Sequence, residues 1–280
     1  MHSAFALDPN EPFLADHCPG GKPLLGTAMG IELMARAARR SAAMPTPGAL
    51  CVEQIAIHEP LVLGGPQGMA PRADVQASPL ADGSVQCSVH GRSRADAAVP
   101  LFDARISTFT GGAPPTALPD TMDLLMPLNV RAPQVYALYF HGPAWRVVRS
   151  ARLAGEAMLC ELNPYLPALM RDAHDPLVAA PQWVELAMQA AGLLEIALRA
   201  RMMIPHRIER IAVFAPVEAA PRQQVFACAR FSGAGTDIDL VDAGRRLLLR
   251  ISGYQTTALP FATDTAAVSA LQRALTARSN

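Results

Sequence analysis

Residues 182–201 read QWVELAMQAAGLLEIALRAR, which is the longest helical pattern in the chain. Apolar side chains recur there at helical spacing, and Pro181 precedes them at a first turn, where proline is well tolerated. A second helix is predicted over 27–40, TAMGIELMARAARR, which ends in arginines. The two helices predict a chain built from two halves of similar make-up.

Each predicted helix is followed by about four predicted strands, separated by Gly, Pro and Asp turns. In the first half, these strands fall at 50–63, 72–79, 84–92 and 99–109. In the second half, a hairpin at 145–153 and 157–162 precedes the helix, and strands follow at 207–215, 223–231, 236–241 and 246–257. Asp242-Ala243-Gly244 is the predicted turn of the last hairpin.

One long helix against an antiparallel sheet is typical of a hotdog fold. We therefore predict an α+β double hotdog, with two antiparallel sheets each wrapped on a central helix. The prolines and glycines of 111–133 indicate a linker of partly extended chain. The predicted units are an N-terminal hotdog at 1–112, a linker at 113–134, a C-terminal hotdog at 135–262 and a tail at 263–280. That tail either adds a short helix or remains mobile.

The composition excludes several classes of function. Of 280 residues, 51% are hydrophobic and 17% charged, which is enough to bury a sizeable core. Lys plus Arg and Asp plus Glu are 24 each, and this balance speaks against nucleic-acid binding or an anionic membrane surface. No apolar run is long enough for a transmembrane helix, and the N-terminus lacks signal-peptide features. Five scattered cysteines argue against a disulfide framework or zinc site and favour a reducing cytoplasm.

The first segment with chemical potential is DHCPGGKPLLG, residues 16–26. It places His17 in a Gly/Pro-rich loop before the first helix, where an imidazole can act as a base. The helix N-terminus offers unpaired N–H groups to a developing oxyanion. An ordinary loop histidine is the alternative, and it is the commoner one for this segment alone.

The second segment is PQWVELAMQ, residues 181–189. Glu185 lies early in an apolar helix, and Gln189 lies on the same face four residues later. A carboxyl group among apolar side chains tends to stay protonated near neutral pH and can act as an acid. A solvated glutamate stabilised by the helix dipole is the alternative.

The third segment is YALYFHGPAW, residues 136–145. Aromatic residues followed by Gly-Pro indicate a tight turn that walls an apolar pocket. A packed strand entrance is the alternative.

In order and separation, the three segments resemble the dehydratase domains of polyketide synthases and polyunsaturated fatty acid synthases, a double-hotdog family. The resemblance spans about residues 8–260. His17 and Gly21 fit the family pattern H-x-x-x-G-x-x-x-x-P, but Gly26 stands in place of the proline. Residues 138–145 look like an FHGPxF variant of the family's Y-x-x-x-G-x-x-Y-G-P-x-F region.

The family's second-half pattern is P-x-x-x-D-x-x-x-Q/H. Pro181, Glu185 and Gln189 fit it, with glutamate in place of aspartate. The swap adds one methylene, about 1.3 Å of reach. Asp175, in AHDP, is a rival acid that ranks second because it lies before the helix and lacks a Gln four residues later.

The resemblance implies a 3-hydroxyacyl-[acyl carrier protein] dehydratase, a hydro-lyase of polyketide or polyunsaturated lipid biosynthesis. It would remove water from a 3-hydroxyacyl thioester carried on phosphopantetheine, giving a 2-enoyl thioester. His17 would be the base, Glu185 the acid and Gln189 the group that orients the acid. No metal or organic cofactor is implied. The implied substrate-binding residues are Gly21, Tyr139, Phe140, His141, Gly142, Pro143 and Trp145.

The partners implied are an acyl carrier protein and other polyketide or fatty acid synthase domains. Many relatives are dimers, so a homodimer is compatible with the resemblance. Candidates for docking the acidic carrier are Arg39, Arg40, Arg146, Arg149 and Arg152.

Several alternatives stay open. A product-template-like cyclase or a double-bond isomerase of this fold would use the same histidine and acid on an acyl chain. A hotdog thioesterase lacks a reason to pair His17 with Glu185 across two halves. The departures at Gly26 and Glu185 motivate a noncatalytic acyl-binding domain.

Overall fold

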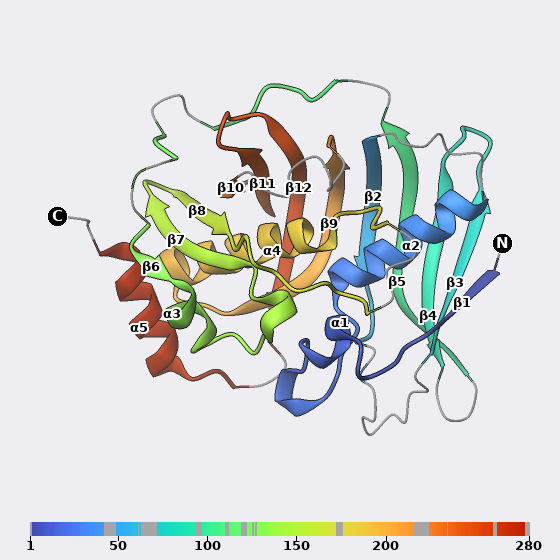
Figure 1. The fold of residues 1–280 in the computed structure, drawn as a ribbon, viewed down its shortest axis with the longest axis horizontal. Coiled ribbons are helices and arrows are strands. Elements are labelled where there is room, and N and C mark those ends of the chain that lie inside the picture. The colour runs from blue at the N-terminus through green and yellow to red at the C-terminus, as the bar shows by residue number, and fades with distance from the viewer. Residues whose placement is uncertain are drawn as a thin grey trace.

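The computed structural model describes residues 2–41, 49–60, 62, 72–92, 97–109, 112–118, 122–124, 126, 128–171, 176–215, 224–233, 235–259 and 262–277 (Figure 1). The α-helices and the two 3₁₀ turns (η) in these ranges are α1 Pro12–Ala15, η1 Pro19–Gly21, α2 Thr27–Ser41, α3 Ala132–Tyr136, η2 Pro143–Trp145, α4 Pro181–Arg199 and α5 Thr265–Thr276. The strands are β1 His2–Ala6, β2 Ala49–Ile57, β3 Arg72–Pro79, β4 Val85–Arg92, β5 Ala98–Phe109, β6 Val130–Arg131, β7 Val148–Ala154, β8 Ala157–Leu162, β9 Met203–Val213, β10 Val225–Ser232, β11 Gly235–Asp242 and β12 Leu247–Ala258.

Among the described residues, twelve strands form one antiparallel sheet in the order β1-β3-β4-β5-β2-β9-β12-β11-β10-β8-β7-β6. The two halves meet where β2 pairs with β9, with Leu50 opposite Val213 and Ile55 opposite Ile208. The prediction of two sheets was therefore wrong in one respect, because the sheets are joined edge to edge. Their pairing satisfies backbone N–H and C=O groups that two separate sheet edges would leave open.

A long helix packs against each half of this sheet (Figure 1). Helix α2 contacts β3, β4 and β5, whereas α4 contacts β7 to β11. Helix α4 is apolar on nearly all sides because α2 and α5 also contact it. The sequence therefore predicted both principal helices, α2 and α4.

The predicted elements agree closely with the observed ones, and the structure adds several details. The tail forms α5, which Asp264 caps by accepting hydrogen bonds from two backbone N–H groups. The predicted turn at 242–244 joins β11 to β12, and Arg245, which follows it, has a φ of 63°. Strands β1 and β6 are too short for a periodic pattern to reveal. The strand predicted at 50–63 is shorter in the structure, where β2 ends at Ile57. Residues 61 and 63 of that prediction lie outside the described ranges.

The described part of the predicted linker forms a strap, by which we mean a segment of residues 113–134 packed on the surface of the second half. Leu118, Leu124 and Leu128 are buried against Leu159 and Phe226 of the sheet. Its leucines therefore bury apolar surface, which stabilises the strap against the second half.

A buried carboxylate joins the two halves beneath the start of α4. Glu32 on α2 is fully buried and accepts hydrogen bonds from Val178 N and Ala179 N, the latter at 2.8 Å. It also accepts a hydrogen bond from Arg36 Nε at 2.7 Å. Since these N–H groups directly precede α4, Glu32 positions the helix that carries Glu185.

We expect Glu32→Ala to lower the free energy of unfolding by about 3 kcal/mol, because it leaves a buried guanidinium and two N–H groups without this acceptor. Urea denaturation measures the effect. The control is Glu53→Ala, which breaks the 3.8 Å Arg210–Glu53 pair, in which both side chains are well over a third exposed. That loss should stay within about 1 kcal/mol. Equal losses in the two variants would contradict the assignment.

Candidate active site

The backbone of the first loop fixes the orientation of His17. The short helix α1 ends just before it, and His17 N donates to Leu14 O at 3.1 Å. Its side-chain Nδ1 lies 2.9 Å from Leu24 O. A carbonyl oxygen can only accept, so Nδ1 carries the hydrogen in this contact. The lone pair of the neutral ring is then at Nε2, where a base needs it.

The surroundings of His17 keep its imidazole neutral at physiological pH. The pKa of His17 is lowered to about 4, chiefly by burial and also by the neighbouring His141. Glu185 and the Leu24 carbonyl act in the opposite direction without reversing the shift. A neutral imidazole with a free Nε2 is a competent general base.

The glycine that replaces the family proline lies directly against this base. A Cβ built on Gly26 would lie 3.2 Å from both Nε2 and Cε1 of His17. Helix α2 begins at the next residue, so its N-terminal N–H groups are close to the imidazole. Gly21 is placed differently. It is exposed, and its N–H donates to Cys18 O at 3.1 Å within a turn.

Glu185 is held by a directed chain of hydrogen bonds on the second long helix. Val148 N donates to Tyr136 Oη at 2.8 Å, and that hydroxyl donates to Gln189 Oε1 at 2.8 Å. Gln189 Nε2 then donates to Glu185 Oε1 at 2.9 Å and to Trp145 O at 3.0 Å. Each donor and acceptor role agrees with its chemistry, and Gln189 contacts Glu185 on the helix face that their spacing predicted.

His141 lies between the two predicted catalytic groups. Its Nε2 is 3.2 Å from Glu185 Oε1, and both side chains are buried. Its ring stacks on Phe140 with centroids 4.3 Å apart, and its centroid lies 5.4 Å from that of His17. The resemblance implied only a substrate-binding role for His141, because nothing in its spacing shows a contact with a glutamate on the later helix.

The charge state of Glu185 differs from the expectation. Burial raises the pKa of Glu185, but hydrogen bonds from His141 and Gln189, together with nearby His17, outweigh burial. The net result is a pKa below the usual value for a glutamate. The prediction that this carboxyl stays protonated was therefore wrong for the free protein, because imidazole and amide donors replace the apolar surroundings the sequence suggested.

Asp16, to which the sequence analysis gave no role, binds the aromatic loop (residues 136–145) to the first half. Gly142 N donates to Asp16 O, and Ala144 N donates to Asp16 Oδ2, each at 2.7 Å. A Cβ on Gly142 would overlap the Asp16 carboxylate. Trp145 Nε1 adds a hydrogen bond to Phe13 O at 2.9 Å. These contacts bring His141 beside His17, although they lie more than a hundred residues apart.

The predicted wall residues have different surroundings. Tyr139 reaches α4 at Gly192, where a built Cβ would lie 2.6 Å from its hydroxyl. Phe140 is 46% exposed and covers His141, whereas Trp145 is 1% exposed and belongs to the core. Pro143 is exposed at the start of η2.

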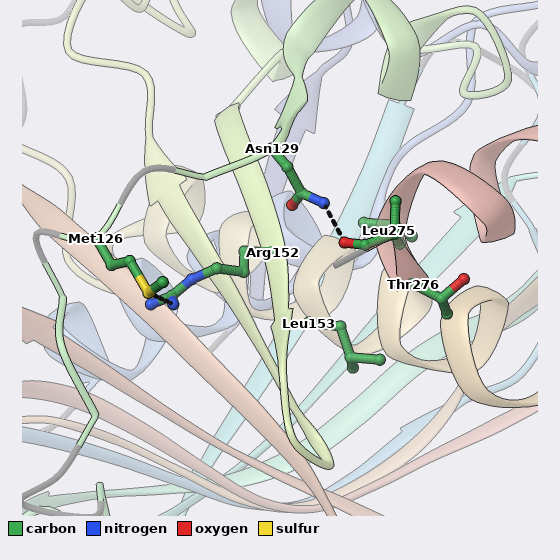
Figure 2. Close-up of a pocket in the computed structure, with 7 residues that line it drawn as sticks. Met126, Asn129, Arg152, Leu153, Leu275 and Thr276 are labelled. Carbon is green, nitrogen blue, oxygen red and sulfur yellow. Dashed lines mark hydrogen bonds between the residues drawn. The ribbon is translucent and has the colours of Figure 1, made fainter. Parts of the chain in front are cut away.

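A pocket of about 300 Å³ lies apart from these side chains (Figure 2). It is lined by Met126, Asn129, Arg152, Leu153, Leu275, Thr276 and Ala277. Arg152 is buried there and donates to Met126 Sδ at 2.8 Å and to Asp123 O at 2.6 Å. Arg152 is therefore not the surface arginine that carrier docking was expected to use.

Within the described ranges, no group of three or more His, Cys, Asp or Glu side chains is arranged to hold a metal ion. No helix of the described chain is long and apolar enough to cross a membrane. Asp175, the rival acid, lies outside the described residues.

The lowered pKa of His17 predicts that the protein loses stability in acid. Above pH 6.5 neither state binds this proton, and between about pH 6.5 and about 4 only the unfolded chain does. Unfolding therefore becomes easier as pH falls, by up to about 3 kcal/mol for this group. Urea denaturation near pH 7 and near pH 4 should show a smaller pH dependence for His17→Phe than for the unmutated protein. Equal pH dependence would contradict the assignment.

A buried neutral histidine beside a buried carboxylate, contributed by two joined halves, is the site of an acid–base enzyme. A family model described as polyketide synthase dehydratase domain matches residues 3–92. A second, described as polyketide synthase dehydratase N-terminal domain, matches residues 127–266. The chain belongs to the polyketide synthase dehydratase family, whose reaction is dehydration of 3-hydroxyacyl intermediates in polyketide synthesis.

Solved structures share the fold over nearly the whole chain. A trans-AT polyketide synthase dehydratase domain from Brevibacillus brevis is 19% identical, with a TM-score of 0.74 over 92% of this chain and 93% of its own. A variant of the PpsC dehydratase domain from Mycobacterium tuberculosis is 18% identical, with a TM-score of 0.73 over 92% and 93%. The dehydratase domain of RzxB from Pseudomonas fluorescens is 19% identical, with a TM-score of 0.70 over 91% and 94%.

Proposed function

We propose that this protein removes water from a 3-hydroxyacyl thioester held on the phosphopantetheine of an acyl carrier protein. The product is a 2-enoyl thioester of polyketide biosynthesis. The observation that carries the proposal is the buried juxtaposition of His17, His141 and Glu185. Elimination of water across two adjacent carbons requires a base at one carbon and a proton donor at the other, and the two halves supply such a pair.

The base step uses the free nitrogen of His17. Its Nε2 takes the proton from C2, and the electron pair of that bond forms the C2–C3 double bond. The thioester carbonyl gains negative charge as this occurs. Because Gly21 N–H is engaged in its own turn, we assign stabilisation of that oxygen to the N–H groups at the start of α2.

The acid step belongs to the second half. The C3–O bond breaks, and the departing hydroxyl takes a proton from the acid group of the second half and leaves as water. We assign the role of this acid group to Glu185, which Gln189 aligns. Gln189 and His141 both contact the Oε1 atom of Glu185. Its other oxygen, Oε2, has no such contact with the described residues, so we assign Oε2 to the substrate.

The architecture supports the double-hotdog interpretation, since each half has its own helix against its part of the sheet. We keep the proposed units at 1–112, 113–134, 135–262 and 263–280. The carrier protein and neighbouring synthase domains are the proposed partners.

The test is mass spectrometry of an acyl carrier protein loaded with a short 3-hydroxyacyl chain that carries two deuterons at C2. Dehydration should remove the hydroxyl group and one deuteron together. Loss of the whole acyl group would indicate a thioesterase instead. An unchanged mass would overturn the proposal, and the short chain removes cyclisation as a route to water loss.

A further inference from the structure

The acid side of the site contains a histidine that the family pattern does not require. His141 occupies the position before Gly-Pro where that pattern has tyrosine. The side chain is 8% exposed, and its Nδ1 is buried without a hydrogen-bond partner among the described residues. A buried polar atom left without a partner is costly and needs an explanation, and a group that binds there during function supplies one.

The two ring nitrogens of His141 have different surroundings. Nε2 faces Glu185 Oε1 at 3.2 Å, and a carboxylate oxygen accepts, so this nitrogen carries a hydrogen. Gln189 Nε2 donates to the same carboxylate oxygen at 2.9 Å. A carboxylate that receives two such donors is stabilised as the anion, and a buried anion is stabilised further by a cation beside it. The Glu185 carboxylate therefore places a negative charge directly beside the His141 ring.

The other titratable groups around this pair are poor proton donors. Burial raises the pKa of Tyr136 on α3, of Tyr139 and of Tyr254 on β12 well above the usual value, and Glu185 adds to each shift. His17 is neutral, and its Nδ1 hydrogen is committed to a backbone carbonyl. Of the groups named here, His141 remains as the one that contacts Glu185 and has a ring nitrogen, Nδ1, without a partner among the described residues.

We propose that the proton for the leaving hydroxyl is held on His141 and departs from Nδ1, while the Glu185 carboxylate keeps that imidazole protonated and aligned through Nε2. This inference rests on the proposed function and changes only which atom hands over the proton. His141 is then a catalytic residue, and Glu185 orients it as a buried carboxylate orients a histidine in other acid–base sites.

The step balances. His17 Nε2 gains the C2 proton, the C3–O bond breaks, and the departing oxygen takes the Nδ1 proton to leave as water. One histidine has gained a proton and the other has lost one. Because their ring centroids are 5.4 Å apart, the proton that must return has only a short distance to travel.

The first test is the variant His141→Gln, whose side-chain amide can still donate to Glu185 but cannot carry a transferable proton. We expect kcat to fall by about 10²-fold or more, with KM nearly unchanged. A His141 that only positions Glu185 would be replaced well by glutamine, so near-normal turnover in this variant would overturn the inference. His58→Gln is the matched control, because His58 also faces a carboxylate, Asp103, but at the surface; its turnover should be unchanged.

The second test needs no turnover. Nitrogen-15 NMR of the histidine rings near pH 7, assigned with His141→Gln, should show both nitrogens of His141 protonated. In Glu185→Gln the same ring should be neutral, because its counter-charge is gone. A neutral His141 in an unmutated protein that dehydrates its substrate would overturn this inference alone. A protonated His141 in a protein that dehydrates nothing would overturn the proposed function and the donor role, leaving only the ion pair.

Discussion

His17→Ala should reduce kcat for water elimination from the carrier-bound 3-hydroxyacyl chain about 10³-fold. The imidazole of His17 is neutral, and its free nitrogen, Nε2, lies beside the start of α2. Without it, nothing removes the C2 proton, and later steps have no substrate. Mass spectrometry of the loaded carrier, sampled over time, measures the loss.

Two further variants separate chemistry from folding. His17→Asn keeps a side-chain N–H that can bind Leu24 O but has no basic nitrogen, so its activity should match that of His17→Ala. His58→Ala removes a half-exposed histidine and should leave turnover intact. Substantial dehydration by His17→Asn, with a normal melting temperature, would show that another group is the base.

Glu185→Gln should lower kcat by a similar factor, about 10³-fold, while KM changes little. The amide preserves the shape of the side chain and can accept the hydrogen bond from Gln189, so the fold should persist. It carries no negative charge, however, and cannot maintain a protonated imidazole beside it. Time-resolved mass spectrometry of the loaded carrier gives kcat, and thermal melting reports the folded fraction.

Glu185→Asp tests the reach that distinguishes this chain from the family pattern. Its carboxylate keeps the charge but lies about 1.3 Å farther from His141 and Gln189, so we expect an intermediate loss of about 10-fold. An active Glu185→Gln combined with an inactive Asp175→Asn would move the acid assignment to Asp175. The family membership would be unaffected.

Local patterns in the sequence were sufficient for most of the elements. Helical periodicity with Pro181 at its start predicted α4, and alternation between turn residues predicted strands such as β3 and β8. The resemblance carried by His17, the Gly-Pro loop and Glu185 also assigned these three segments to one site. Such signals suffice because periodicity and turn chemistry depend on neighbours within a few positions.

Contacts between distant segments were decided only by the tertiary structure. The β2–β9 pairing that joins the halves, the buried Glu32 beneath α4 and the Asp16 link to the aromatic loop have no local signature. The buried place of Arg152 is of the same kind, because it depends on the chain around Asp123.

The electrostatics of the site show the same division most clearly. The sequence surrounding Glu185 is apolar and predicted a neutral acid, yet His141 and Gln189 donate to it and favour the carboxylate. A residue type and its spacing specify which group is present and on which helix face it lies. Its proton affinity depends on every charge and donor within a few ångströms, and folding brings those from elsewhere in the chain.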